Sequence, residues 1–174
     1  MDPLRIALPH LAPRAADLAY NQRLVEQGIA IATQAGANWI ITPELATTGY
    51  TFAEIIGTDW IATQPDAWLQ HICEMARRHG VAIFLGHVER DQERDPLHNS
   101  VFAIAASGEL LRQHRKINTL RIGSEAWSTL GVDSTVIDLH PYGRVGILIC
   151  ADACSPGIAA QLKANGFATE FDNG

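Results

Sequence analysis

Short apolar runs closed by proline or glycine constrain the fold of this chain more than any other feature of its sequence. Residues 4–8 (LRIAL) and 39–42 (WIIT) each end at a proline, and residues 81–85 (VAIFL) follow a glycine. A continuous apolar run of four or five residues between such breakers is typical of a buried strand. We therefore expect three core strands in the first half of the chain.

Two segments between these runs have the 3.6-residue period of helices. The first is predicted over residues 18–35, with Asp17 as its N-cap and Gly36 ending it. In the second, Pro65 occupies a position that helices favour for their first proline, and the helical spacing continues to Gly80. The residues at helical spacing are Leu18, Val25, Ile29 and Ala32 in the first segment and Trp68, Ile72, Met75 and His79 in the second.

The second half of the chain predicts strands in pairs. Ser107 and Gly108 form a tight turn within the first pair, and residues 141–143 lie at the turn of the second pair. The polar stretch of residues 90–98 (RDQERDPLH) predicts a surface loop between strands. The predicted strands span residues 100–105, 109–114, 135–139 and 144–149.

The order of these elements indicates the fold class. A last helix is expected to begin at Ser155 or Pro156 and to end near Gly166. Strands thus alternate first with helices and then with one another, which predicts a mixed sheet covered by helices, the α/β class. A length of 174 residues suits one domain.

Composition excludes several classes of protein. The chain has 13 Lys and Arg against 19 Asp and Glu, a net charge of −6, so it lacks the basic surface that binds nucleic acid. No apolar run approaches the ~18 residues of a membrane span. Residues 1–11 lack the pattern of a signal peptide, and three cysteines do not form a disulfide framework. We expect a soluble, cytoplasmic protein.

Three residues at the ends of apolar or strand-like segments are candidates for chemistry. Cys150 ends a strand near a predicted helix N-terminus, where the thiolate is favoured and sulfur becomes a nucleophile. Glu44 follows the WIIT strand, at the rim where α/β sheets place ligands, and can shuttle protons there. Lys116 can stabilise a developing oxyanion. Taken singly, each has a structural alternative: an inert buried thiol, a helix-capping or solvated carboxylate, and a solvated lysine at a strand end.

Together, the three segments resemble the nitrilase superfamily, the carbon–nitrogen hydrolases. The resemblance covers residues 4–166, and the order and spacing of its motifs make it specific. The motifs are Pro43-Glu44-Leu45 with Gly49-Tyr50, His114-Arg115-Lys116-Ile117, and Gly146-Ile147-Leu148-Ile149-Cys150-Ala151-Asp152.

The resemblance implies a catalytic role for each matching residue. Cys150 would be the nucleophile that attacks an amide or nitrile carbon. Glu44 would be the general base, and Lys116 would stabilise the tetrahedral intermediate. Glu125, nine residues after Lys116, resembles the second glutamate of the family, which orients substrate and lysine. The backbone N–H of Ala151 would be an oxyanion donor.

The residues around the motifs refine the expected chemistry. In the family that this chain resembles, true nitrilases have a Cys-Trp-Glu pattern. Many amidases and carbamoyl hydrolases instead have an aspartate two positions after the cysteine, and Asp152 occupies that position in this chain. Ala151 replaces a bulky aromatic residue, and Cys154 stands where many of those amidases carry an arginine, so the acyl group accepted is left open. Asn99 also resembles a family position, for which we expect a structural role.

The resemblance implies no metal and no organic cofactor. Cys150 and Cys154 have a C-x-x-x-C spacing without a second pair, which is a weak zinc signal. The expected partner is a small-molecule amide-type substrate, with neither nucleic acid nor membrane. The resemblance also implies a homo-oligomer, a dimer or larger.

The implied fold is an α-β-β-α sandwich that is incomplete at the C-terminus. Members of the family continue past the cysteine helix into further strands and helices. We therefore expect residues 1–166 to be the N-terminal part of a carbon–nitrogen hydrolase domain and residues 167–174 an atypical tail. The leading hypothesis is hydrolysis of a small amide or carbamoyl substrate through a thioester. The alternatives are a non-catalytic truncated fragment or interaction module, and nitrile hydrolysis or acyl transfer by the same three residues.

Overall fold

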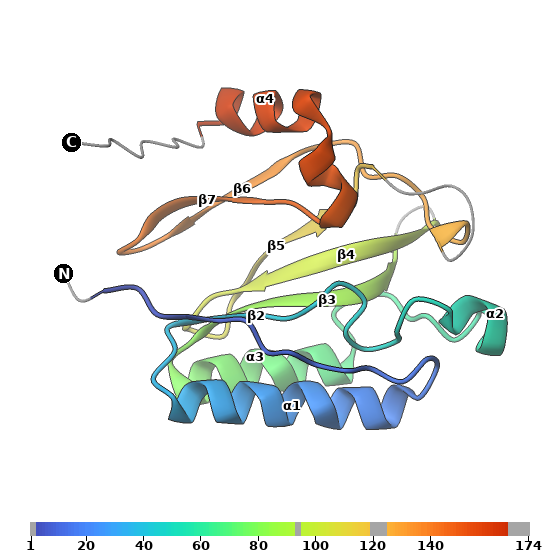
Figure 1. Cartoon of the computed structure of the whole chain (residues 1–174), viewed down its shortest axis with the longest axis horizontal. Coiled ribbons are helices and arrows are strands. Elements are labelled where there is room, and N and C mark those ends of the chain that lie inside the picture. The colour runs from blue at the N-terminus through green and yellow to red at the C-terminus, as the bar shows by residue number, and fades with distance from the viewer. Residues whose placement is uncertain (1–2, 93–94, 119–124, 167–174) are drawn as a thin grey trace.

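Four layers of secondary structure are stacked in the order helix, sheet, sheet, helix (Figure 1). The computed structural model describes residues 3–92, 95–118 and 125–166. Helices α1 and α3 form the first layer, a five-stranded sheet the second, a two-stranded sheet the third, and helix α4 the fourth. The predicted α/β class and the α-β-β-α arrangement are confirmed. Residues 167–174, predicted to be an atypical tail, lie outside the described residues.

The five-stranded sheet is mixed, as the order of the predicted elements indicates. Strands β1, β2 and β3 run parallel, and β3, β4 and β5 are antiparallel neighbours in the order β1-β2-β3-β4-β5. Strand β3 is buried over its first eight residues, because helices cover one face and the second sheet covers the other. The strands are β1 (Ile6–Ala7), β2 (Trp39–Ile41), β3 (Ala82–Arg90), β4 (Leu97–Ile104) and β5 (Leu110–Arg115).

Helices α1 (Leu18–Gln34) and α3 (Ala67–His79) begin at capping aspartates; the C-cap of α1 is Ala35, one residue before the predicted Gly36, and that of α3 is Gly80. The Asp17 side chain accepts a hydrogen bond from the backbone N–H of Tyr20, as predicted. Gly80 ends α3 in the left-handed conformation, which costs glycine little. The apolar faces of both helices pack on the sheet in one cluster of buried side chains that includes Val25, Ile29, Leu69, Ile72, Ile83, Leu85, Phe102 and Ile104.

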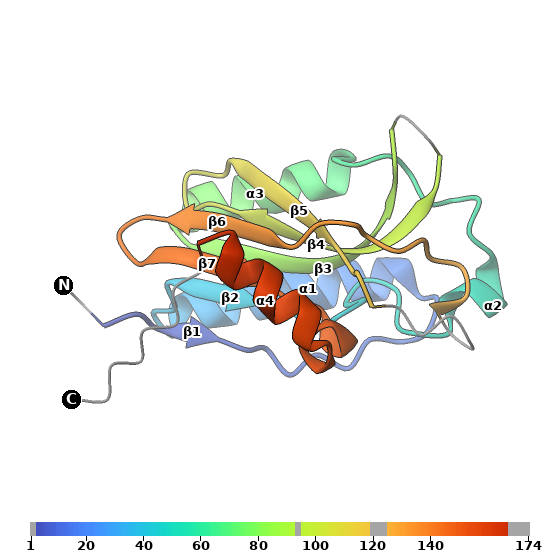
Figure 2. The same ribbon diagram turned by 90° about the horizontal axis from the view of Figure 1, so that it is seen from above.

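The second sheet is a hairpin of β6 (Thr135–Leu139) and β7 (Gly143–Ile147). It lies over the other face of the large sheet, with α4 (Pro156–Ala164) on its outer side (Figure 2). Ile158 and Leu162 of α4 are buried. The space between the two sheets is filled by Trp39, Ala82, Phe84, Ala103, Ile137, Leu139 and Ile147.

Several local predictions are wrong. The stretch of residues 90–98 is not all loop, because β3 extends to Arg90 and β4 begins at Leu97. Pro65 is not the first residue of a helix, because Asp66 is the N-cap of α3. Two short helices were not predicted, namely α2 (Phe52–Ile56) and the 3₁₀ turn η2 (Cys150–Cys154). Both have only five residues, too few for a helical period to show in the sequence.

Within the described ranges, no helix is long and apolar enough to cross a membrane.

Gly86 allows the chain after β2 to cross the face of the large sheet. A Cβ atom built on Gly86 would overlap the carbonyl oxygen of Pro43 and would lie 3.1 Å from the Cα of Glu44. The absence of a side chain on this β3 residue therefore fixes how closely the segment that carries Glu44 approaches the sheet.

Replacing Gly86 with alanine should destabilise the protein by about 2 kcal/mol, because backbone atoms must shift to admit the methyl group. Thermal unfolding should then occur roughly 4–8 °C lower. Gly157→Ala is the matched control, because nothing lies within 4 Å of the added Cβ atom. A Gly86→Ala protein as stable as the Gly157→Ala protein would contradict this packing.

Candidate active site

Three of the predicted residues follow three different strands and meet at one end of the two sheets. Glu44 follows β2, Lys116 follows β5, and Cys150 comes after β7 at the start of η2. The Lys116 backbone N–H donates to the carbonyl of Asn99 over 2.8 Å, which continues the β4–β5 pairing to the lysine. The strand order therefore gathers residues that lie 72 and 34 positions apart in the sequence (116 − 44 and 150 − 116).

The Lys116 ammonium lies between two carboxylates. Its Nζ atom is 2.6 Å from Glu44 Oε1 and 2.6 Å from Glu125 Oε1. The three side chains are between 2% and 8% exposed. Burial alone would lower the pKa of Lys116, but the hydrogen bonds and charges of Glu125 and Glu44 outweigh it and raise the pKa. The lysine is therefore a fixed positive charge.

Two further polar side chains contact the glutamates. Asn99 Nδ2 donates to Glu44 Oε1 over 2.7 Å and to Glu125 Oε1 over 2.9 Å. The Tyr50 hydroxyl donates to Glu44 Oε2 over 3.0 Å. Burial, followed by the charge of Glu44 and this hydrogen bond, raises the pKa of Tyr50 to about 12, so the hydroxyl keeps its proton.

Sequence reasoning gave Asn99 only a structural role and gave Tyr50 none. Asn99 lies on the same face of β4 as Val101 and Ala103, which pack between the sheets. The alternation of a strand would therefore have pointed its side chain toward the site. Tyr50 was quoted only within a motif, and nothing in the sequence shows that its hydroxyl reaches back six residues to Glu44.

Cys150 is exposed and has a positive φ of 46°, unusual for a residue other than glycine. The predicted reason for its reactivity is wrong, because its thiolate is not favoured. Burial, followed by the charge of Glu44, raises the pKa of the Cys150 thiol; Lys116 and the backbone N–H of Ala151 act in the opposite direction. Residues 151–155 separate Cys150 from the start of α4, so the charged group that most affects the thiol is the carboxylate of Glu44 rather than a helix N-terminus. The thiol thus retains a proton that Glu44 is placed to accept.

Asp152 ties the cysteine segment to the lysine segment. Its carboxylate is fully buried and accepts hydrogen bonds from the backbone N–H groups of Ile149, Ile117 and Asn118 at 2.7–3.0 Å. It also lies 3.1 Å from His114 Nε2. Burial alone would raise the pKa of Asp152, but these hydrogen bonds, led by that of His114, outweigh it and lower the pKa. The carboxylate therefore holds the residues after Lys116 against those before Cys150.

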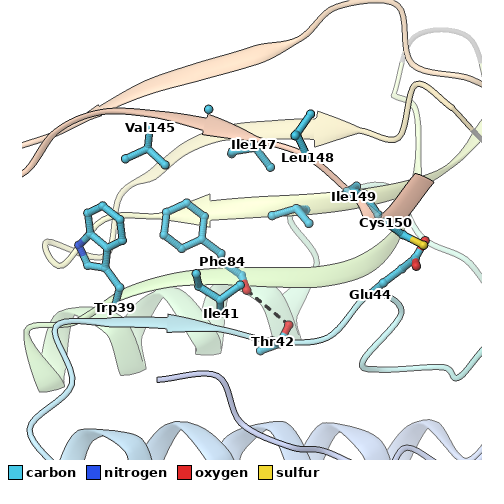
Figure 3. Close-up of a pocket in the computed structure, with 12 residues that line it drawn as sticks. Trp39, Ile41, Thr42, Glu44, Phe84, Val145, Ile147, Leu148, Ile149 and Cys150 are labelled. Carbon is cyan, nitrogen blue, oxygen red and sulfur yellow. Dashed lines mark hydrogen bonds between the residues drawn. The ribbon is translucent and has the colours of Figure 1, made fainter. Parts of the chain in front are cut away.

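A cavity of about 210 Å³ opens between the sheets next to Cys150 and Glu44. These two residues lie side by side at one end of it, and Trp39 lies at the other (Figure 3). Its walls are mainly apolar and include Ile41, Phe84, Val101, Val145, Ile147 and Leu148. Among the described residues, no group of three His, Cys, Asp or Glu side chains is arranged to hold a metal ion.

A family model described as carbon–nitrogen hydrolase matches residues 5–168. The chain therefore belongs to the carbon–nitrogen hydrolase family.

Some relatives of this chain are named amidases and others nitrilases. A probable nitrilase of Schizosaccharomyces pombe is 25% identical over 180 residues, which cover 97% of this chain and 64% of that protein. A glutamine-dependent NAD(+) synthetase of Thermotoga maritima is 24% identical over 90% of this chain and 27% of that protein. The crystal structure of an amidase from Nesterenkonia sp. is 25% identical and has a TM-score of 0.80, with 94% of this chain and 61% of that one covered. The chain thus spans less than two thirds of the length of each.

Replacing Asp152 with alanine should cost about 3–5 kcal/mol, because His114 and three backbone N–H groups lose a buried acceptor. Denaturant unfolding at pH 7 measures this loss. Since folding lowers the pKa of Asp152, its contribution is present above the ordinary value of 3.8 and is lost as the pH falls further. The difference between wild type and variant should therefore stay constant from pH 7 to about 5 and narrow below about 4.

Asp138→Ala is the control for this prediction, because Asp138 is 79% exposed and pairs only at the surface with Arg144. Equal losses for the two variants would show that Asp152 does not connect the two segments.

Proposed function

We propose that this chain carries the catalytic residues of a cysteine-dependent amidohydrolase acting on a small amide or carbamoyl substrate. The observation that carries the proposal is the Lys116 ammonium held between two carboxylates, with an exposed thiol beside one of them. The arrangement supplies a nucleophile, a proton acceptor and a fixed positive charge at one point. The carbon–nitrogen hydrolase family is the expected setting for these three functions.

In the first half of the reaction, Glu44 takes the proton of the Cys150 thiol as sulfur attacks the carbonyl carbon. The raised pKa of the thiol makes this proton transfer necessary at neutral pH. Lys116 and the backbone N–H of Ala151 stabilise the oxyanion. The carbon–nitrogen bond then breaks, and the leaving amine receives the proton from Glu44, so that ammonia departs and an acyl thioester remains on Cys150.

In the second half, Glu44 accepts a proton from water as the water attacks the thioester. The carbon–sulfur bond breaks, the proton passes to sulfur, and the carboxylic acid leaves with the thiol restored. Glu125 Oε1 lies 2.6 Å from Lys116 Nζ, which supports a role in orienting the lysine and the substrate. No step of the proposed reaction requires a metal or an organic cofactor.

Amides are favoured over nitriles by Asp152, which resembles the amidase pattern at two positions after the cysteine. Nitrilase-named relatives keep nitrile hydrolysis as the second candidate. The two are distinguished by supplying matched pairs of an amide and a nitrile with the same alkyl group. Acyl transfer would appear as a hydroxamate when hydroxylamine is added, at the expense of the free acid.

The proposal extends to the whole protein. In this proposal, residues 1–166 are the N-terminal part of a carbon–nitrogen hydrolase domain, which the family-model match to residues 5–168 supports. The protein acts in the cytoplasm as a homo-oligomer on a small-molecule substrate. Size-exclusion chromatography with light scattering measures the assembly.

Cys150→Ala and Glu44→Gln should each lower ammonia release from a panel of aliphatic amides by about a thousandfold or more, because one removes the nucleophile and the other its base. Cys154→Ala is the matched control, because Cys154 is an exposed thiol in the same 3₁₀ turn and should leave the rate unchanged.

Two results would contradict this proposal. One is ammonia release that persists in the Cys150→Ala protein. The other is a folded wild-type chain that releases neither ammonia nor acid from amides and nitriles, which would favour a non-catalytic role.

A further inference from the structure

Asn99 makes an unusual pair of hydrogen bonds at the centre of the site. Its Nδ2 atom donates to one oxygen of Glu44 and to one oxygen of Glu125, which are the same two oxygens that Lys116 contacts. The four side chains therefore close a ring in which each glutamate Oε1 accepts from both the ammonium and the amide. Asn99 is 1% exposed, so water does not compete for these contacts.

The ring holds two carboxylates close together. One ammonium faces two carboxylates, and all three side chains are almost fully buried. Two like charges that share a buried site disfavour each other, and one of them tends to take a proton. Hydrogen bonds to the ionised form oppose this tendency. An amide NH₂ group that donates one hydrogen to each carboxylate stabilises both without adding another charge.

The orientation of the amide is fixed by its neighbours. Turning it over would aim Oδ1, an acceptor only, at two carboxylates that are also acceptors. In the observed orientation Oδ1 is buried and has no hydrogen-bond partner among the described residues. Most buried side-chain polar atoms in folded proteins have a hydrogen-bond partner, so an unpaired buried acceptor calls for an explanation. Here both donors are used on the glutamates and the acceptor is left unpaired.

We propose that Asn99 is a positioning residue that bridges Glu44 and Glu125 and keeps both carboxylates ionised beside the Lys116 ammonium. This inference rests on the proposed function, because it explains how Glu44 remains free to accept the Cys150 proton while a second carboxylate lies beside the same lysine. Without the bridge, either Glu44 or Glu125 would already carry a proton, and this would interfere with the transfer of the thiol proton to Glu44.

The test removes the donors in two ways. Asn99→Leu replaces the amide with an apolar group of similar size, and Asn99→Ser leaves one smaller donor. The acidic limb of the pH profile of kcat/KM for an amide should move upward by about one pH unit in Asn99→Leu and by a smaller amount in Asn99→Ser, because the carboxylates lose bonds to their ionised forms. If Asn99→Leu does not fold, Asn99→Ser alone carries the test.

Asn165→Ser is the matched control for the serine variant. The Asn165 amide also donates to neighbouring groups, the carbonyl and hydroxyl of Ser134, but it lies at the end of α4 among uncharged partners. Its variant should lose some stability and keep the wild-type pH profile. A purely structural role for Asn99 predicts the same behaviour for Asn99→Ser.

A second measurement reads the carboxyl groups without turnover. In protein labelled with carbon-13 at glutamate Cδ, the Glu44 and Glu125 signals are assigned with Glu44→Gln and Glu125→Gln. At a pH where both wild-type signals show carboxylates, one should show a carboxylic acid in the Asn99 variants. Folded Asn99→Leu and Asn99→Ser proteins with wild-type carboxyl titrations and an unmoved acidic limb would overturn the inference. Because the titration needs no substrate, it stands even if Cys150→Ala retains activity and the proposed function fails.

Discussion

The Lys116 ammonium, shared by two buried carboxylates, is the interaction on which the rest of the site depends. Removing one member of a buried ion pair costs about 3–5 kcal/mol, because the remaining charge has lost its partner in a poorly solvated place. Glu44, Lys116 and Glu125 come from three separate segments, so their ion pairs hold those segments together as well as supplying the charge for chemistry. Function and local stability therefore rest on the same atoms.

The scaffold meets this requirement through specific backbone contacts. Gly86 lets the segment that carries Glu44 lie against the sheet. Asp152 connects the segments that carry Lys116 and Cys150 by accepting from their backbone N–H groups. Cys150 itself has a positive φ, a conformation that persists where the surrounding structure enforces it. These constraints place the sulfur beside Glu44 at the open end of the cavity between the sheets.

The sequence predicted the apolar framework well because burial leaves a period in the residue types. The run 135–139 is a strand with the predicted bounds, and Asp17 caps α1 as expected. Buried polar residues leave no such period. His87 and Glu89 extend β3 beyond the predicted run because Thr47 and Arg115 contact them inside the protein. A polar residue with a buried partner looks the same in the sequence as a polar residue in a loop.

The same limit applies to the site. Its residue types and their order in the chain indicated which side chains meet, and the structure brings Glu44, Lys116, Glu125 and Cys150 together. The amide of Asn99 and the carboxylate of Asp152 act through partners that lie 55 and 35 residues away (99 − 44 and 152 − 117). Only strand register and loop geometry decide such contacts. The electrostatics of Cys150 also depend on Glu44 in space rather than on the nearby helix in sequence.

The central claim is that Cys150 forms a covalent bond with the acyl group of an amide. Mass spectrometry of the protein after an acid quench during steady-state turnover tests it most directly. The account predicts an adduct equal in mass to the substrate minus ammonia, located on Cys150 and absent from Cys154. Turnover without any adduct on Cys150, or with the acyl group on another residue, would contradict it.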